Sequence, residues 1–503
     1  MLSPESIRRP LAALAGIVAG ITALGFAELV TAMNSTFVSP VVSVGDRVID
    51  FAPPWLKDTA ISLFGTNDKL ALLIGIAALV LAYAATVGVL AFRRNLAWGL
   101  IGIGLFGAIG AAAAVAEGEV LSSLPSVGGA LAGMAVLWFL HRGWQGGSEV
   151  SESRRHLLAG LGASALLAGG FGATGVFLGR RFAIDPSSGV LPPVRQALAP
   201  IPSGTGFDVP GLASFVTTNE DFYRIDTALT VPQIAAADYS LKIFGMVDRE
   251  VVLTYQDLLN LPQVEADITL TCVSNEVGGR LVGNARWQGV LLSDVLAQAG
   301  IQSGADQIVG RSFDGYTCGF PTAALEDGRE ALIALGMNGD PLPAVHGYPV
   351  RLVVPGLYGY VSGTKWLEEI ELTTFAAFDQ YWVPRGWAAE APIKTSSRID
   401  TPAAFTALPP GKQMIAGVAW AQTRGIETVE VSIDDGPWQL AELAEELNNT
   451  TWRQWRLEWD VTPGRHTITV RSTDTTGALQ VEERARPMPD GATGWHQIVV
   501  TGQ

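Results

Sequence analysis

The sequence predicts three parts in order: a helical membrane region, an α+β domain and an all-β domain. Five long apolar spans occupy the first third of the 503 residues. Short strand-like and helix-like segments then alternate, which is typical of an α+β domain. After Pro392, alternating strands such as VEVSIDDGPW and the clustered residues Trp452, Trp455 and Trp459 indicate an all-β sandwich.

The apolar spans are mostly long enough to cross a bilayer. We expect them at residues 10–33, 69–92, 96–116, 124–140 and 157–178, of which the fourth is the shortest. Arginine pairs or clusters flank alternate ends, which predicts that those ends are cytoplasmic and that the rest of the chain lies outside. These arginines are Arg8, Arg9, Arg93, Arg94, Arg142, Arg154 and Arg155, whereas Arg180 and Arg181 oppose this orientation weakly.

Two features inside the spans have competing interpretations. The segment GIGLFG, with Gly102, Gly104 and Gly107, matches a dinucleotide fingerprint, but no strand precedes it, and close helix packing explains it better. Glu28 lies deep in the first span, where it is either functional or a protonated structural residue. His141 and His156 both sit at cytoplasmic edges, so we predict no haem in the membrane.

The charge and the cysteine count narrow the function classes. A formal net charge of -15 argues against a nucleic-acid partner. Two cysteines, Cys272 and Cys318, exclude a disulfide-rich scaffold, although one bridge between them is possible outside the cytoplasm.

Cys272 is the first candidate ligand. In ITLTCVSNEVGGRLVGNARW, Ile268, Leu270 and Cys272 alternate with threonines, so they share one face of a strand. Glycines and Asn275 then break regular structure, which leaves the thiol at a strand end where a ligand can approach. Taken alone, a buried cysteine is more often a small hydrophobic residue than a ligand.

A second motif favours the interpretation of Cys272 as a ligand. The segment HGYPVRLVVPGLYGYVSGTKW, which begins at His346, resembles the molybdopterin-binding segment of the sulfite oxidase family. That family also places a molybdenum-ligating cysteine at a strand end, followed by Asn, as Cys272 is followed by Asn275. The resemblance implies molybdopterin as cofactor and Cys272 as the metal ligand.

The same resemblance implies a set of site residues. TTNEDFYRIDTALTVP looks like the opening segment of that fold, so Tyr223 and Arg224 would face the cofactor, with Asn219 beside them. A pterin phosphate calls for fixed cations, hydroxyls and amides. The implied cofactor-binding residues are Asn219, Tyr223, Arg224, Cys272, Asp314, His346, Arg351, Ser362, Gly363, Thr364 and Lys365. His346 and Arg351 also have ordinary structural explanations, a hydrogen-bonded turn and a surface ion pair.

The implied function is a membrane-anchored oxidoreductase that transfers an oxygen atom in a two-electron step, with its catalytic domain outside the cytoplasm. Arg224 would steer the substrate, and Tyr316 or Tyr360 would donate hydrogen bonds near the reacting oxygen. Glu276 and Val277 replace the basic pair that holds sulfite in the family, so an S- or N-oxide reductase is an alternative. A cofactor-free membrane-anchored binding or adhesion protein is an alternative of another class.

The expected organisation follows from these segments. We expect a membrane domain at 1–182, a Pro-, Gly- and Ser-rich linker at 183–212, a molybdopterin-binding domain at 213–392 and an immunoglobulin-like dimerisation domain at 393–503. The expected partners are a small oxyanion or S-/N-oxide, a separate electron carrier or quinone, the membrane and a second copy of the chain. In SESRRHLLAG, Arg154 and Arg155 match a twin-arginine export signal or, equally, the positive-inside rule.

Overall fold

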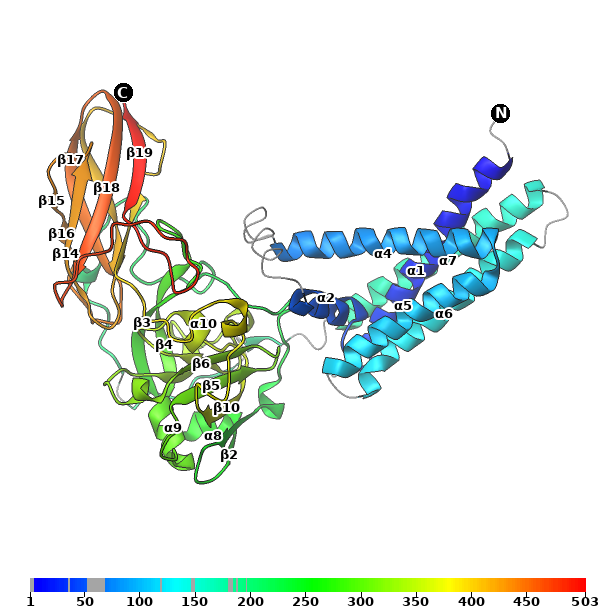
Figure 1. The fold of residues 1–503 in the computed structure, drawn as a ribbon, viewed down its shortest axis with the longest axis horizontal. Helices are drawn as coiled ribbons and strands as arrows, with labels where there is room; N and C mark the ends of the chain where they lie inside the picture. The colour runs from blue at the N-terminus through cyan, green and yellow to red at the C-terminus, as the bar shows by residue number, and fades with distance from the viewer. Residues whose placement is uncertain are drawn as a thin grey trace. The chain divides into compact units, whose positions relative to one another are not determined.

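The computed structural model describes residues 4–34, 37–51, 68–117, 120–145, 150–179, 184–186, 189–195 and 197–503 (Figure 1). The chain divides into two compact units. The first comprises residues 1–183 with 228–230, and the second comprises 184–227 with 231–503. Arg180 and Arg181 lie outside the described residues.

The first unit is helical. Five helices in its described part are long and apolar enough to cross a membrane. They are α1 (Pro4–Thr31), α4 (Asp68–Arg93), α5 (Leu96–Glu117), α6 (Leu124–Gln145) and α7 (Val150–Gly179). The expected fourth span is longer than the sequence indicated, because the apolar stretch runs over residues 120–145. A shorter helix, α2 (Pro40–Phe51), was not predicted, since its apolar residues are interrupted by Asp46 and Arg47.

Small residues let these helices approach closely. A Cβ atom added to Gly16 of α1 would lie 2.0 Å from the carbonyl oxygen of Ala84 in α4. In α5, a Cβ atom on Gly102 would meet Val87 at 2.6 Å, and one on Gly107 would meet Ala130 at 2.4 Å. The prediction that GIGLFG serves helix packing is therefore confirmed. Glu28 in α1 is half-buried and accepts a hydrogen bond from the Ser39 hydroxyl.

The second unit begins with a mixed sheet and an antiparallel sheet. One has the strand order β2-β1-β10-β5-β6, and β1 runs parallel to β10. Its strands are β1 (Ser240–Gly245), β2 (Val251–Thr254), β5 (Gln307–Ser312), β6 (Thr317–Pro321) and β10 (Leu367–Thr373). The other has the order β3-β4-β7-β8, with β9 paired to β7. Its strands are β3 (Val264–Thr271), β4 (Val282–Leu291), β7 (Leu332–Met337), β8 (Asp340–Pro341) and β9 (Arg351–Val353).

Short helices join these strands, as the sequence predicted. α8 (Tyr255–Asn260) begins at a capping box in which Thr254 and Asp257 each bind the other's backbone amide. α9 (Leu292–Ala299) ends at Gly300, whose φ of 72° suits a residue without a side chain. α10 (Gly359–Ser362) is a single turn after β9. The α+β prediction for this region is confirmed.

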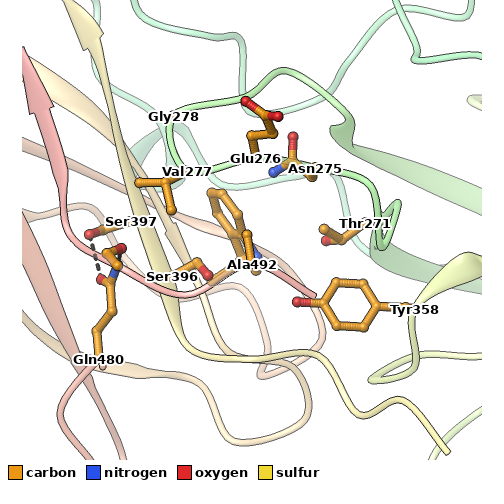
Figure 2. Close-up of a pocket in the computed structure, with 12 residues that line it drawn as sticks. Thr271, Asn275, Glu276, Val277, Gly278, Tyr358, Ser396, Ser397, Gln480 and Ala492 are labelled. Atoms are coloured by element: carbon orange, nitrogen blue, oxygen red, sulfur yellow. Dashed lines mark hydrogen bonds between the residues drawn. The ribbon is translucent and has the colours of Figure 1, made fainter. Parts of the chain in front are cut away.

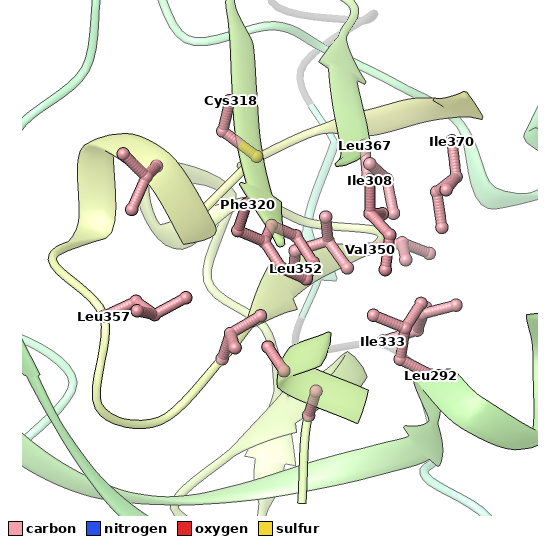
Figure 3. Close-up of a cluster of buried hydrophobic side chains, with 14 of the residues drawn as sticks. Leu292, Ile308, Cys318, Phe320, Ile333, Val350, Leu352, Leu357, Leu367 and Ile370 are labelled. Atoms are coloured by element: carbon pink, nitrogen blue, oxygen red, sulfur yellow. The ribbon is translucent and has the colours of Figure 1, made fainter. Parts of the chain in front are cut away.

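A continuous apolar core lies between the two sheets. Figure 3 shows side chains from β5, β6 and β10 meeting side chains from β7, β9 and α9. Leu292, Ile308, Phe320, Ile333 and Leu352 are fully buried there. Burial of side chains of this size stabilises a fold by about 1.5 to 3 kcal/mol each. This core fixes the ends of β3, β9 and α10, which carry the candidate site.

The last part of the second unit is β-rich. Its two sheets have the orders β11-β13-β17-β16 and β12-β19-β18-β14-β15. The strands are β11 (Ser396–Thr401), β12 (Ala407–Leu408), β13 (Gly411–Trp420), β14 (Ile426–Ile433), β15 (Gln439–Leu440), β16 (Glu442–Leu443), β17 (Arg453–Val461), β18 (Gly464–Asp474) and β19 (His496–Gly502). Buried residues of both sheets, including Ile415, Val431 and Trp455, form one core. A β-rich region is confirmed, whereas its immunoglobulin-like character and its role in dimerisation stay predictions.

Two details differ from the expectations. The three tryptophans do not form one cluster: Trp452 belongs to the core of the α+β region, whereas Trp455 and Trp459 pack in the β-rich core, where Trp459 also lies edge-on against His466. The described part of the predicted linker is not free, because its carbonyl groups accept hydrogen bonds from the second unit. Gln288 donates to Pro192, Arg286 to Ala199 and the Glu445 amide to Gly204.

Candidate functional site

A large cavity lies in the α+β region where several strand ends meet. It encloses about 840 Å³ of unfilled space, counted with its open mouth. Its walls come from five segments and one tryptophan. The lining residues are Phe222, Tyr223, Ile225, Asp226, Thr227, Leu270, Cys272, Ser312, Asp314, Tyr316, Arg351, Val353, Val354, Gly359, Tyr360, Ser362, Gly363, Lys365, Trp366 and Trp382.

The cavity unites most of the predicted residues. Nine of them line it: Tyr223, Cys272, Asp314, Tyr316, Arg351, Tyr360, Ser362, Gly363 and Lys365. Asn219, Arg224, His346 and Thr364 do not. Segments almost one hundred and fifty residues apart are therefore brought to one place, as the resemblance implied.

Cys272 directly follows β3 and is buried. Its amide donates to the Leu281 carbonyl, and its carbonyl accepts from the Asn275 amide, so the turn holds its backbone on both sides. Burial raises the pKa of the thiol, while hydrogen bonds from Ser274 and the charge of Lys365 act in the opposite direction. Both Cys272 and Cys318 are free thiols, so no bridge joins them.

Arg351 is a buried cation with no carboxylate partner among the described residues. Its Nη1 donates to the His346 carbonyl at 3.0 Å, and its guanidinium stacks over Trp287 with 4.9 Å to the ring centroid. Burial lowers its pKa to about 10, because removal from water disfavours the charged form of the guanidinium. A buried cation that faces a cavity without a counter-ion is suited to an anionic ligand.

Lys365 also reaches the cavity, but it is paired. Its Nζ donates to the Asp226 carboxylate and to the Val345 carbonyl, both at 3.0 Å. Arg224 binds the same carboxylate at 2.9 Å, and its side chain is 41% exposed. Arg224 therefore lies at the surface beside the site rather than in its lining, which differs from the expectation that it faces the cofactor.

His346 and Asn219 lie behind the lining. The ring nitrogen Nε2 of His346 is 2.8 Å from the carbonyl oxygen of Asn219, an acceptor, so this nitrogen carries the proton. The other nitrogen, Nδ1, is buried and has no partner among the described residues. It is thus an acceptor that a bound N–H group would satisfy. The Asn219 side chain accepts from Asn338 at 2.8 Å and donates to the Met337 carbonyl at 3.2 Å, which ties this loop to β7.

The turn from Ser362 to Lys365 differs from the expectation in detail. Thr364 is fully buried and donates its hydroxyl to the Cys318 sulfur at 2.9 Å, so it faces the core and not the cavity. The Gly363 amide donates to the Gly359 carbonyl at 2.8 Å and is not free. The Ser362 hydroxyl lies within hydrogen-bond distance of the carbonyls of Leu357 and Tyr358. A ligand would meet the oxygen of Ser362 and the ammonium of Lys365 here, rather than two free amides.

Tyr316, Tyr360 and Asp314 already have hydrogen-bond partners within the protein. Tyr316 donates its hydroxyl to the Tyr360 carbonyl at 2.6 Å, and Tyr360 donates its own to the Ala388 carbonyl at 2.7 Å. Burial raises the pKa of both phenols, and of half-buried Tyr223, so all three stay protonated. The donor role predicted for Tyr316 or Tyr360 would require a change of hydrogen-bond partner. Asp314 accepts from the Thr227 hydroxyl at 3.0 Å.

Several lining residues were missed by the sequence analysis. Asp226 and Thr227 lie in the segment that contains Tyr223, and their alternation with Ile225 carried no distinct signal. Trp382 is remote in sequence, and Trp366 was quoted only as part of a motif. These two indole rings and Phe222 make much of the wall apolar, as in most small-molecule sites.

The residues present fit a pyranopterin. The cavity offers one soft sulfur, one uncompensated buried guanidinium, a buried acceptor nitrogen behind the wall and flat aromatic rings. Within the described residues no three His, Cys, Asp or Glu side chains could hold a metal together. A metal at Cys272 would therefore take its other ligands from the cofactor.

The comparisons with known proteins agree with this site. Residues 228–382 match the oxidoreductase molybdopterin binding domain. The chain is 30% identical over 305 residues to mitochondrial sulfite oxidase of Homo sapiens. This alignment covers 51% of this chain and 55% of the human protein. It is 26% identical over 350 residues to sulfite oxidase of Arabidopsis thaliana, covering 58% of this chain and 89% of that protein.

A solved structure shows the same fold. The sulfane dehydrogenase SoxCD of Paracoccus pantotrophus superposes with a TM-score of 0.50 at 21% identity, over 60% of this chain and 87% of that one. Fold and site together define the class of this region, an oxidoreductase molybdopterin binding domain. Over about half of its length the chain is similar to sulfite oxidases. The chain spans about half the length of the first of these relatives, 55% of the human protein.

The buried His346 gives a first testable prediction, a loss of stability in acid. Burial lowers its pKa to about 4, whereas the unfolded chain has about 6.5. Between these values the unfolded state binds more protons, so stability falls as the pH drops from about 6.5 towards 4 and is constant above that window. The contribution at pH 5 is roughly 2 kcal/mol.

His346→Gln should remove that part of the acid sensitivity. Thermal unfolding of the cofactor-free protein at pH 7 and pH 5 measures the effect: the wild type should lose several degrees more than the variant. The buried His496, whose pKa burial also lowers to about 4, stays in both proteins and contributes to the loss that remains in the variant. Equal losses in the two proteins would show that His346 is protonated in the fold.

Proposed function

We propose that this chain is a membrane-anchored molybdenum enzyme that transfers an oxygen atom in a two-electron step outside the cytoplasm. The observation that supports this most is the buried Cys272 sulfur in the same cavity as Arg351, a cation without a carboxylate partner among the described residues. When bound, the molybdenum cofactor supplies the oxygen-atom and electron transfer. In the oxidative direction sulfite and water give sulfate, two protons and two electrons, and a separate carrier or quinone takes the electrons.

The proposed roles of the chain's own residues follow from their positions. Cys272 holds the metal as a thiolate, since a soft sulfur ligand suits it. Arg351 and Lys365 hold the anionic part of the cofactor, and the Ser362 oxygen and His346 Nδ1 satisfy its polar groups. Asp226 keeps Lys365 oriented, since the two are 3.0 Å apart. Tyr223, Trp366 and Trp382 exclude water from the walls. Arg224, exposed beside the site, steers an approaching substrate.

The opposite direction of the same chemistry is the second candidate. An S- or N-oxide would give up its oxygen as water, with two electrons and two protons consumed. Glu276 and Val277 follow Cys272 in the turn where a basic pair would favour sulfite, and this observation supports the reductase. Purified enzyme tested with sulfite and an electron acceptor, and with dimethyl sulfoxide and a reduced viologen dye, separates the two directions. Turnover of neither class by molybdenum-loaded protein would contradict the proposal.

Membrane anchoring and export complete the proposal. The five apolar helices are long enough to cross a bilayer, and Arg154 and Arg155 lie with exposed side chains in the first turns of α7. A domain that receives molybdopterin in the cytoplasm must be exported folded, which favours the twin-arginine route. The β-rich region is proposed to join two copies of the chain.

Arg154→Lys with Arg155→Lys tests the export route. The double variant keeps both charges and so spares the positive-inside effect. We expect the second unit to stay inside cells and resist protease added from outside, whereas the wild type is digested. An Arg93→Lys, Arg94→Lys double variant is the matched control and should export normally. Digestion of the first variant as in the wild type would contradict the twin-arginine route but not the enzyme.

A further inference from the structure

The strand that leads to Cys272 lies at the edge of its sheet. In the order β3-β4-β7-β8, only one side of β3 is paired with another of the described strands. An edge strand presents a row of unpaired amide and carbonyl groups on its other side. Because β3 ends at Thr271, directly before Cys272, whatever binds this outer edge also holds the strand end that carries the thiol.

The β-rich region caps this edge at Thr269, which is fully buried. The Thr269 amide donates to the Thr450 carbonyl at 3.0 Å, and the Thr269 carbonyl accepts from the Gln422 side chain at 2.9 Å. The Thr269 hydroxyl accepts from the Trp452 amide at 2.8 Å and donates to the Asn284 side chain of β4 at 3.0 Å. Three of these four bonds come from the β-rich region.

The capping segment, between β16 and β17, is itself fixed by Asn448. The side-chain oxygen of Asn448 accepts from the amides of Thr450 and Thr451 at 3.0 and 2.9 Å. The Asn448 amide nitrogen and the Thr450 hydroxyl both lie within hydrogen-bond distance of the Asp267 carbonyl, at 3.2 and 2.9 Å. The outer edge of β3 is therefore bound at two successive outward-facing residues, Asp267 and Thr269.

The β-rich region also holds the turn on the other side of Cys272. Buried Arg398 of β11 donates to the Gly279 carbonyl in this turn at 2.9 Å. A Cβ atom added to Gly278 would lie 2.3 Å from Nε2 of His496 in β19, so the turn packs directly against this ring. Figure 2 shows the turn beside the start of β11. Cys272 thus lies between two segments that the β-rich region binds.

The cap at Thr269 is close enough to affect the thiol. Thr269 lies three residues before Cys272, and the side chains of Leu270 and Cys272 both line the cavity. A site of this kind requires its groups within about 0.5 Å of the working geometry. Partners that orient a metal ligand typically change metal affinity or activity by about 10- to 100-fold. A loosened edge at Thr269 would move the sulfur by displacing the strand end.

We infer that the β-rich region positions the Cys272 thiol in the cavity, and that Thr269 and Gln422 are the positioning residues. The inference rests on the proposed function for the use of this thiol as a metal ligand. It gives the β-rich region a role within a single chain, separate from dimerisation. Gln422 is 1% exposed and binds Thr269 through its side chain, so a substitution can remove that bond alone.

Alkylation of the thiol in cofactor-free protein tests this positioning. In the full chain in detergent, made in a host without molybdopterin and carrying Cys318→Ser, iodoacetamide can react with one cysteine only. Gln422→Met removes the bond to Thr269 and nearly keeps the size of the side chain. We expect the alkylation rate to rise about tenfold, because the freed strand end exposes the sulfur. Thr269→Val removes the hydroxyl and keeps the side-chain shape, and should raise the rate similarly.

Gln263→Met is the matched control, at the opposite end of β3. Gln263 is 2% exposed, and its side chain donates to the carbonyls of Leu258 and Leu261 at 2.9 and 3.0 Å. Like Gln422, it has a buried side-chain oxygen without a partner among the described residues. Gln263→Met should lower the melting temperature as Gln422→Met does, but leave the alkylation rate of Cys272 unchanged.

The molybdenum-loaded protein gives a spectroscopic readout of the same positioning. The g values of a molybdenum(V) electron paramagnetic resonance signal depend on the direction of its thiolate ligand. They should shift in Gln422→Met and in Thr269→Val, with turnover lowered about 10- to 100-fold, and stay unchanged in Gln263→Met. Unshifted g values in both Gln422→Met and Thr269→Val overturn the inference.

The alkylation rates separate this inference from the proposed function. Equal rises in Gln422→Met and Gln263→Met overturn the inference, because the effect would then come from lost stability. Unchanged rates in both Gln422→Met and Thr269→Val overturn it as well, and the hydrogen bonds would then only join the two regions. Wild-type protein without molybdenum contradicts the proposed function, whereas the rates of cofactor-free protein still decide whether the thiol is positioned from the β-rich region.

Discussion

Replacing Cys272 with serine is expected to leave a folded protein with less than about one per cent of the wild-type turnover. A hydroxyl is a hard, weakly acidic ligand, so it would neither bind molybdenum as a thiolate does nor set the same redox potential. The fold should survive, because Cys272 is a small buried group whose backbone is held by Leu281 and Asn275. Turnover per folded molecule and molybdenum content measure the effect.

Cys318→Ser is the matched control for this variant. Cys318 is also buried and free, but its sulfur accepts from Thr364 in the core and does not line the cavity. A serine oxygen can accept the same hydrogen bond, so activity should be nearly unchanged. Equal loss in both variants, with no free thiol in the wild type, would instead favour a disulfide and contradict the ligand role.

Arg351→Met should have opposite effects on the cofactor-free and the loaded protein. Without cofactor, the variant removes a buried charge that has no carboxylate partner, so its free energy of unfolding should rise by roughly 1 to 3 kcal/mol. In the loaded protein, each lost charge-assisted hydrogen bond to the cofactor costs about 1.5 to 3 kcal/mol. Pterin content should therefore fall at least tenfold. Melting of protein made in a host without molybdopterin, and pterin analysis of loaded protein, give the two values.

Arg286→Met is the control, because it should change the stability of the cofactor-free protein in the opposite direction. Arg286 is paired with the buried Asp267 at 2.8 Å and lies outside the cavity. Its removal leaves a buried carboxylate without its partner, so the cofactor-free protein should lose stability while pterin content per folded molecule stays the same. If Arg351→Met destabilises the cofactor-free protein and keeps its full pterin content, Arg351 has a structural role and the proposed anion site is wrong.

The order of structural classes could be predicted from the sequence because each class has its own periodicity. Long apolar runs and alternating strands are local signals, and the structure confirms both. The Thr254 capping box and the Gly300 helix end are local features of the same kind. The helix α2 and the docked linker were missed, since both depend on partners distant in sequence. The same limit applies to Trp452 and Trp455, which enter different cores although only three residues apart.

The site was predictable only where a motif named its residues. Cys272 and Arg351 were found through two separated segments that the fold unites. Thr364 was misplaced because a turn motif does not show which side chain faces the core, and here the Cys318 sulfur takes its hydroxyl. The pairing of Lys365 with Asp226 is a long-range property of packing that no sequence pattern carries.

Metal and pterin analysis of the purified full chain tests the central claim most directly. The account predicts about one molybdenum atom per chain, released together with a pterin that fluoresces after oxidation, and a loss of that metal in Cys272→Ser. A folded wild-type protein that contains neither molybdenum nor pterin, from a host that makes both, would contradict it and favour a cofactor-free binding or adhesion protein.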